Sequence, residues 1–174
     1  ITRGEFSALA GPSGSGKSTL LNLIGTLDRP TKGTVSYEGR VVSSLEADPL
    51  SDFRLRSLGF VFQAYNLIPV LTAVENVEYP LVLQGVEPVE RRRLAYEALG
   101  WVGLENYAER RPDLLSGGQQ QRVAVARAIV TRPSLVLADE PTANLDSKTG
   151  AQLLDLMQGL NKEHDITFLF SSHD

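Results

Sequence analysis

One segment constrains the fold more than any other: the eight residues Gly11-Pro12-Ser13-Gly14-Ser15-Gly16-Lys17-Ser18. An apolar run at 6–10 precedes it and an apolar helical pattern at 17–25 follows it. The spacing is that of G-x-x-x-x-G-K-[ST], in which backbone amides at the start of a helix surround phosphate oxygens. An ordinary Gly/Ser turn is the alternative, but chance gives this pattern in roughly one such chain in a few hundred. The segment therefore predicts a phosphate site, with Lys17 on the phosphates and Ser18 on Mg²⁺.

The remaining strand and helix patterns alternate along the chain. Short apolar runs at 58–62, 134–138 and 166–170 join the run at 6–10, and helical patterns fall at 88–100, 119–130 and 153–160. A stretch at 34–42 alternates around Glu38-Gly39, which is typical of a hairpin with a glycine turn. The order predicts an α/β fold with a mostly parallel sheet and a small antiparallel β part. Residues 64–131 are predicted to form an inserted helical subdomain, and 1–63 with 132–174 the core lobe, of one domain.

Composition narrows the function classes. The 174 residues are 42% hydrophobic with a net charge of -4 and no cysteine. This balance excludes intrinsic disorder, and the missing cysteines exclude disulfide frameworks, zinc–thiolate sites and cysteine nucleophiles. The mildly acidic charge disfavours nucleic-acid binding, so no nucleic-acid partner is expected. Apolar runs lie close to both ends, and the first residue is Ile1. We therefore expect the interior of a longer chain, truncated at both ends.

Two acids follow the apolar run at 134–138. Asp139 and Glu140 would stand where that strand ends, and ligands of open α/β sheets sit at the carboxyl ends of the strands. Asp139 can hold a metal through water, and Glu140 can take a proton from an attacking water. A solvated acidic turn would be the better interpretation for the pair alone. Together with the phosphate loop, the pair indicates a site for metal-assisted phosphoryl chemistry.

A second glycine segment, Leu115-Ser116-Gly117-Gly118-Gln119, precedes the helical pattern at 119–130. A serine hydroxyl and glycine amides at a helix N-terminus can bind an anion. The alternative is a simple helix cap by Ser116, and composition alone favours it.

Three single residues also stand at predicted strand or helix ends. Gln63 follows the run at 58–62 and could span metal and water, although alone it is more often a surface polar residue. His173 follows the run at 166–170, where a lone histidine is usually a loop residue. Asp146 could cap the last helix and also lie at an interface.

In this order, the segments resemble an ATP-binding-cassette (ABC) ATPase along essentially the whole chain. The resemblance rests on Gly11–Ser18, Gln63, Leu115–Gln119, Leu135–Glu140, Ala143–Asp146 and His173. Further segments resemble the lipoprotein-release and macrolide-export branch, namely Leu27–Gly33, Gly59–Gln63, Asn66–Pro69, Glu75–Val77 and Ala138–Thr142.

The resemblance implies ATP and Mg²⁺ as cofactors and a head-to-tail dimer with ATP between Lys17 of one copy and the Ser-Gly-Gly segment of the other. Three residues are then catalytic: Glu140 as the general base, His173 as the sensor of the γ-phosphate, and Gln63. Asp146 links the two sites of the dimer. Mg²⁺ ligation falls to Ser18, Gln63 and, through water, Asp139. Nucleotide binding falls to Gly11, Pro12, Ser13, Gly14, Ser15, Gly16, Lys17, Ser18 and Thr19, with Ser116, Gly117, Gly118 and Gln119 from the other copy. An adenine-stacking residue would lie upstream of Ile1.

The function implied is an ATP-hydrolysing subunit that drives a transmembrane permease, separate or fused, from the cytoplasmic side of the plasma membrane. Residues 64–77 are the expected docking surface for that permease. A non-transport ABC ATPase of translation or DNA repair, a mechanotransmission ATPase and a non-hydrolysing binding module are the alternatives. Intact Lys17 and Glu140 argue against the last. The transported substrate and its direction are left open.

Overall fold

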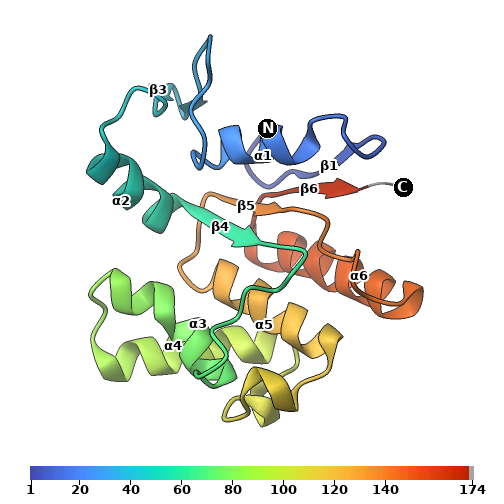
Figure 1. Cartoon of the computed structure of the whole chain (residues 1–174). Coiled ribbons are helices and arrows are strands. Elements are labelled where there is room, and N and C mark those ends of the chain that lie inside the picture. The colour runs from blue at the N-terminus through green and yellow to red at the C-terminus, as the bar shows by residue number, and fades with distance from the viewer. Residues whose placement is uncertain (173–174) are drawn as a thin grey trace.

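A parallel sheet forms the centre of the computed structural model, which describes residues 1–172 (Figure 1). Within those residues four strands lie in the order β1-β6-β5-β4, and every neighbouring pair is parallel. The strands are β1 (Phe6–Ala10), β4 (Leu58–Val61), β5 (Leu135–Ala138) and β6 (Phe168–Ser172). The helices of this part are α1 (Lys17–Ile24), α2 (Ala47–Ser57) and α6 (Ser147–His164). The predicted fold class is confirmed.

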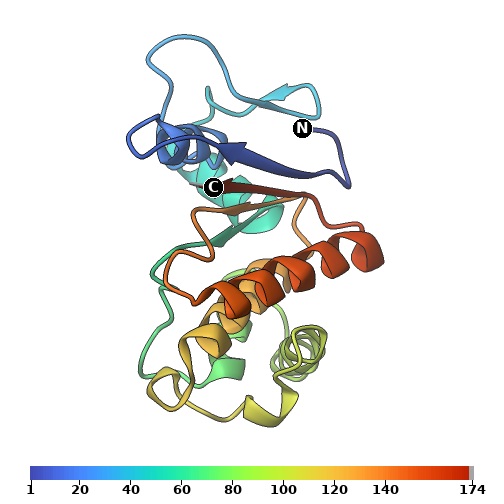
Figure 2. The same ribbon diagram turned by 90° about the vertical axis from the view of Figure 1, so that its right-hand side faces the viewer.

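The sheet is covered on both faces, and strand β5 shows how. Leu135 and Leu137 pack in a cluster with Leu21 of α1, whereas Val136 and Ala138 belong to a larger cluster with helices α5 and α6. Figure 2 shows α6 running along one side of the sheet, with α1 on the other. Because a strand buried on both faces cannot alternate with polar residues, β5 reads as one apolar run, as parallel strands do.

The predicted hairpin is present as a separate antiparallel pair, β2 (Ser36–Tyr37) and β3 (Arg40–Val41). Its two turn residues, Glu38 and Gly39, have φ values of 48° and 79°. Positive φ at both central positions is the type I′ arrangement, whose twist matches that of the flanking strands.

The segment between β4 and β5 is helical and lies below the sheet in Figure 1. It contains α3 (Ala73–Leu83), α4 (Pro88–Trp101), two short 3₁₀ turns, η1 (Glu105–Tyr107) and η2 (Pro112–Leu114), and α5 (Gly117–Ile129). Their shared core is rich in small side chains, with Ala95, Ala98 and Ala126 fully buried. The boundaries of this subdomain at 64 and 131 stay a prediction.

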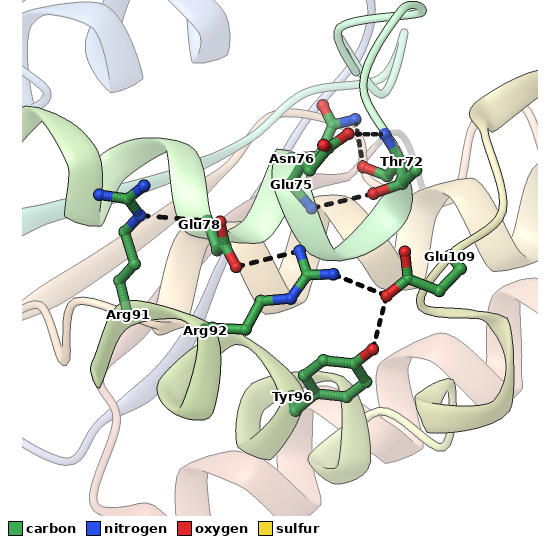
Figure 3. A network of polar contacts seen from close by, with 8 residues as sticks. All are labelled: Thr72, Glu75, Asn76, Glu78, Arg91, Arg92, Tyr96 and Glu109. Atoms are coloured by element: carbon green, nitrogen blue, oxygen red, sulfur yellow. Dashed lines mark hydrogen bonds and ion pairs between the residues drawn. The ribbon is translucent and has the colours of Figure 1, made fainter. Parts of the chain in front are cut away.

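A polar network joins α3 to α4 on one side of that core (Figure 3). Glu78, only 8% exposed, lies 3.2 Å from Arg92 and 3.7 Å from Arg91. Arg92 also reaches Glu109 at 2.7 Å, which in turn accepts a hydrogen bond from Tyr96. A buried carboxylate is costly unless it is paired, so the two arginines make the burial of Glu78 possible.

The prediction and the structure differ at three elements. The last strand occupies 168–172 instead of 166–170, and helices α2 and α3 were not predicted. Helix α3 contains Pro80, which normally argues against a helix interior. The structure places no helix in residues 1–172 that has both the length and the apolarity to cross a bilayer.

Candidate active site

The candidate residues gather where the parallel strands end. The loop 11–16 follows β1, Asp139 and Glu140 follow β5, and Gln63 comes two residues after β4. Strand β6 ends with Ser171 and Ser172. Because parallel strands point their carboxyl ends to the same edge, residues from four distant segments meet there.

The glycine loop has the backbone shape that its sequence predicts. Gly14 and Gly16 have φ values of 79° and 90°, and a Cβ on either would meet no atom within 4 Å. Their need for glycine is therefore conformational and not one of space. Gly16 is the N-cap of α1 and brings no capping side chain. Within residues 1–172, no group accepts a hydrogen bond from the amides of Ser18 and Thr19.

Lys17 lies over this loop and is only 7% exposed. Its ammonium donates to the carbonyl oxygens of Gly11 at 2.6 Å and Pro12 at 3.1 Å. These contacts hold a positive charge against the loop, next to the start of α1 with its open Ser18 and Thr19 amides. The loop thus combines a fixed cation with donors, which is the chemistry that recognises phosphate.

The second contact of the site joins the loop to strand β5. The Ser18 hydroxyl donates to Asp139 Oδ1 at 3.1 Å, although the two residues are 121 positions apart. Residues 1–172 contain no cluster of three or more His, Cys, Asp or Glu side chains that could cage a metal. A hydroxyl and one carboxylate leave most positions to water and phosphate oxygens, which is how Mg²⁺ is usually bound. The residues present therefore fit Mg²⁺ delivered with a phosphate ligand.

Glu140 has an unusual backbone. Its φ of 47° is left-handed, which is uncommon for a residue with a side chain. Its amide donates to Ser171 Oγ at 2.9 Å, and its carbonyl accepts from the Ala143 amide at 3.1 Å. Glu140 lines an open cavity of about 500 Å³ that also borders Asp146 and Ser172. The bend at Glu140 therefore turns the chain so that this residue lines the cavity.

Gln63 was predicted to bind the metal, but in the structure its contacts are with Asn144. Its side-chain Nε2 lies 3.5 Å from Asn144 Oδ1, and Asn144 Nδ2 donates to the backbone carbonyl of Gln63 at 2.9 Å. These contacts connect Gln63 to the turn after Glu140. The structure does not bring the Gln63 side chain into contact with Ser18 or Asp139.

The Ser-Gly-Gly segment begins α5 with a capping box. Ser116 Oγ accepts from the Gln119 amide at 3.3 Å, and Gln119 Oε1 accepts from the Ser116 amide at 2.9 Å. The helix cap considered as an alternative is therefore present. In the described part of the chain, however, nothing accepts from the amides of Gly117 and Gly118.

A side chain at either glycine would be crowded by a neighbouring side chain. A Cβ on Gly118 would lie 2.6 Å from Thr149 Cγ2, and one on Gly117 would lie 2.9 Å from the Tyr65 hydroxyl. Both views place the start of α5 far from the loop after β1, with the sheet between them (Figures 1 and 2). Within one chain, the two glycine segments do not form one site.

Asp146 is the N-cap of α6, as predicted. It accepts from the Thr149 amide at 3.1 Å and from the Thr149 hydroxyl at 2.6 Å. Both hydrogen bonds lower the pKa of Asp146, and the one from the Thr149 hydroxyl has the larger effect. Thr149 is also the residue that faces Gly118, so the start of α6 packs on the start of α5. His173, the remaining predicted residue, lies outside the described residues.

Sequence reasoning missed two residues of this edge. Ser171 is 1% exposed and contacts both Asp139 and Glu140. Asn144 holds Gln63. Ser171 stands at the end of a core strand, so the rule that led to Asp139 could have found it. Nothing in the sequence marks Asn144 as the partner of Gln63, because that contact spans 81 positions.

Comparisons with known proteins agree with this geometry. Residues 1–143 match the family model described as ABC transporter. The ABC transporter ATP-binding protein YtrE of Bacillus subtilis (strain 168) is 50% identical over 174 residues, which are 100% of this chain and 75% of that protein. The lipoprotein-releasing system ATP-binding protein LolD of Geobacter metallireducens is 47% identical over 174 residues, 100% of this chain and 77% of its own length.

A solved structure is also similar. It is the dimeric structure of the ATP-binding cassette MJ0796 of Methanocaldococcus jannaschii in a post-hydrolysis state bound to ADP and Pi. The TM-score is 0.89 at 49% identity, and the match covers 100% of this chain and 77% of that one.

Proposed function

Because the chain belongs to the ABC transporter family, as an ATP-binding domain, we propose that it binds and hydrolyses Mg–ATP between two copies of itself to drive a membrane permease. The observation that carries this proposal is the contact of Ser18 with Asp139 at 3.1 Å. It puts the start of the phosphate-binding helix beside the acid at the end of β5. A phosphate-bound Mg²⁺ needs ligands from both.

Lys17 and the loop amides bind the phosphates. Lys17 would exchange its carbonyl contacts with Gly11 and Pro12 for the β- and γ-phosphate oxygens. Ser18 and Asp139 would hold Mg²⁺, which neutralises charge on the phosphates when bound. The contact with Asn144 uses Gln63 Nε2, so the side-chain oxygen Oε1 is the atom proposed to bind the metal.

Glu140 is the proposed general base. Its backbone is bent toward the open cavity that borders Asp146, and a carboxylate there can take the proton of an attacking water. His173 is proposed to contact the γ-phosphate, as the family resemblance implies.

The partner copy supplies the rest of the site. The amides of Gly117 and Gly118 find no acceptor within residues 1–172, while the Ser116 side chain caps its own helix. A helix N-terminus with open amides favours an anion, and the γ-phosphate of a second copy is a suitable one. The solved relative is itself dimeric, which supports this arrangement.

The permease partner is proposed to dock in an apolar groove of about 510 Å³ between α2, β4, α3 and α5. Leu83 and Tyr79 on its rim are 56% and 43% exposed, and Arg54 and Arg127 line it. The groove extends to Asn66, three residues after Gln63. An occupant would therefore touch the segment that carries Gln63. A short apolar permease segment with a carboxylate suits this lining, and it would hold the domain on the cytoplasmic face of the membrane. LolD supports an assignment to the lipoprotein-release branch.

Replacing Glu140 with Gln tests the hydrolytic role. We expect ATP binding to remain, hydrolysis to fall by about 10²–10⁴-fold, as for a lost general base, and an ATP-bound dimer to accumulate. Nucleotide fluorescence titration, phosphate release and sedimentation in the full chain measure these three quantities. Glu163→Gln, an exposed acid on α6, is the matched control. Unchanged turnover in Glu140→Gln would remove Glu140 from this role.

Replacing Leu83 with Asp tests the docking groove. An acid on the rim should weaken association with the permease by about tenfold or more, since it replaces an apolar contact and repels the carboxylate proposed for the occupant. Basal ATP hydrolysis of the protein without permease should remain. Val89→Asp is the control, because Val89 is 85% exposed and does not line the groove. Equal permease binding by both variants, measured by co-purification, would contradict the docking site.

A further inference from the structure

Ser171 connects the two acids of the proposed site. It is 1% exposed, on β6, next to the end of β5. Its hydroxyl donates to Asp139 Oδ1 at 2.7 Å and accepts from the Glu140 amide at 2.9 Å. One buried side chain therefore fixes a carboxylate and a backbone amide in consecutive residues.

The contact with Asp139 complements that of Ser18. Both hydroxyls donate to Oδ1, Ser18 from α1 at 3.1 Å and Ser171 from β6 at 2.7 Å. A hydroxyl oxygen can bind Mg²⁺ through a lone pair while its O–H still donates to Asp139, so the proposed function leaves the Ser18 contact possible but places it at the exposed, metal-facing side of the carboxylate. Ser171 belongs to the buried sheet and can keep its own. The Asp139 carboxylate then stays oriented while the metal binds.

The contact with Glu140 supports a strained backbone. A non-glycine residue at φ 47° persists only where its surroundings hold it. The Glu140 amide is bonded to Ser171 Oγ and the Glu140 carbonyl to the Ala143 amide. Of these two restraints, only Ser171 comes from another strand, so it ties the bend to the rigid sheet.

We propose that Ser171 is a positioning residue that orients Asp139 toward Mg²⁺ and holds Glu140 in its left-handed bend. The proposal rests on the proposed function, because it assigns Mg²⁺ to Asp139 and the lytic water to Glu140. Ser171 itself touches neither nucleotide nor metal in this assignment. Its effect passes through the two acids.

The test compares Ser171→Ala with Thr167→Val in the full chain. Thr167 is a matched control, because it is 3% exposed, precedes the same strand at its far end, and accepts from the Gly4 amide at 2.9 Å. Each substitution removes a buried hydroxyl and leaves one amide without its partner, so both should lower the melting temperature.

Two readouts separate positioning from stability. Without nucleotide, hydrogen exchange at the Glu140 amide should be about tenfold faster in Ser171→Ala than in wild type or Thr167→Val, since its hydrogen bond is lost. In ATP hydrolysis, the Mg²⁺ concentration for half-maximal rate should rise by about fivefold or more only in Ser171→Ala, while ATP affinity without Mg²⁺ stays within about twofold. Ser171→Thr, which keeps the hydroxyl, should restore both.

Wild-type Mg²⁺ dependence in a folded Ser171→Ala protein overturns the proposal, whatever its hydrogen exchange. A shift of equal size in Thr167→Val also overturns it, because the effect would then be one of stability. Should wild type itself fail to bind Mg–ATP, the proposed function fails instead. The exchange rate of the Glu140 amide then still decides whether Ser171 holds the bend.

Discussion

Helices α3 and α5 both begin with a capping box, but the first backbone amides of the two helices have different partners. Thr72 and Glu75 form a capping box at α3, and Ser116 and Gln119 form one at α5. In each, a hydroxyl accepts from the third amide of the helix and a longer side chain accepts from the amide of the capping residue. Locally, the two sequences make the same structure.

The first two amides of each helix have different surroundings. At α3, the amides of Ala73 and Val74 donate to the carbonyls of Arg110 and Ala108 at 2.8 and 2.9 Å. At α5, the amides of Gly117 and Gly118 find no acceptor in the part of the chain that the structure describes. The comparison shows that a capping box does not by itself predict a binding site. Open amides beyond the cap distinguish α5.

A bulky side chain at the exposed cap should have the largest effect. Ser116→Leu should reduce ATP hydrolysis by about 10²-fold or more, as for a lost donor set at the transition state, because the partner's γ-phosphate could no longer reach the amides of α5. Phosphate release at saturating ATP measures the loss. ATP binding to one copy should remain, since the loop after β1 is unchanged.

The matched cap at α3 is the control. Thr72→Ala should cost about 1 kcal/mol of unfolding free energy, a typical value for a lost N-cap, with no change in turnover per folded molecule. Chemical denaturation and phosphate release separate these effects. Normal hydrolysis by Ser116→Leu, or an equal loss in Thr72→Ala, would remove the functional difference between the two helix starts.

A smaller change tests the space around Gly118. Gly118→Ala puts a Cβ 2.6 Å from Thr149 Cγ2, so either the Thr149 side chain or the packing of α5 on α6 must shift. Overpacking of about 1–3 kcal/mol at the proposed dimer surface should lower hydrolysis by roughly tenfold. Thr149→Ser removes the methyl group and keeps the hydroxyl that donates to Asp146, so adding it should restore activity.

Two outcomes would contradict this account of Gly118. The first is wild-type ATP hydrolysis by Gly118→Ala alone, as expected if the first turn of α5 has room to shift freely. The second is a double variant, Gly118→Ala with Thr149→Ser, that hydrolyses ATP as slowly as Gly118→Ala alone. The clash with the Thr149 methyl group would then not be the cause of the lower rate.

The sequence predicted the features that arise locally. The loop 11–18 carries its own conformational demand in its glycines, and the apolar runs of β1, β4 and β5 lie within one residue of their predicted ends. Strand β6 was placed two residues early because Ile166 and Thr167 continue its buried run. Its pairing with β1, Phe6 to Phe168, sets the true register, and pairing cannot be read from one segment.

Helix α3 was missed although its start signal is in the sequence. Thr72 and Glu75 have the capping-box spacing, although Pro80 inside the helix is a signal of the opposite kind. Tertiary contacts hold the start of this helix: Asn76 is fully buried, and its side-chain amide lies within 3.2 Å of the carbonyls of Ile68, Leu71 and Thr72. In the site, the phosphate loop and Asp139 were predictable from position. The holding roles of Ser171 and Asn144 depend on tertiary contacts and were not.

The smallest predicted effect concerns the one chemical difference between the two capping boxes, a glutamate against a glutamine. The backbone hydrogen bond from Thr72 lowers the pKa of Glu75, and this effect outweighs the opposing effect of burial. A carboxylate whose pKa is lower in the folded state stabilises the protein above its unfolded pKa, about 4.3, and loses that contribution as the pH falls through the folded value. Gln119 cannot titrate in this way. Glu75→Gln should therefore make α3 resemble α5, lowering the melting temperature slightly at pH 7.

The gap between wild type and Glu75→Gln should shrink as the pH drops below about 4, because the protonated carboxyl then resembles the amide. Thermal unfolding from pH 7 to pH 3 measures it, and turnover at pH 7 should be unchanged. A gap that stays constant with pH would mean that the charge of Glu75 contributes nothing. In that case, the two caps would be equivalent in energy as well as in shape, and only the open amides of Gly117 and Gly118 would distinguish α5 from α3.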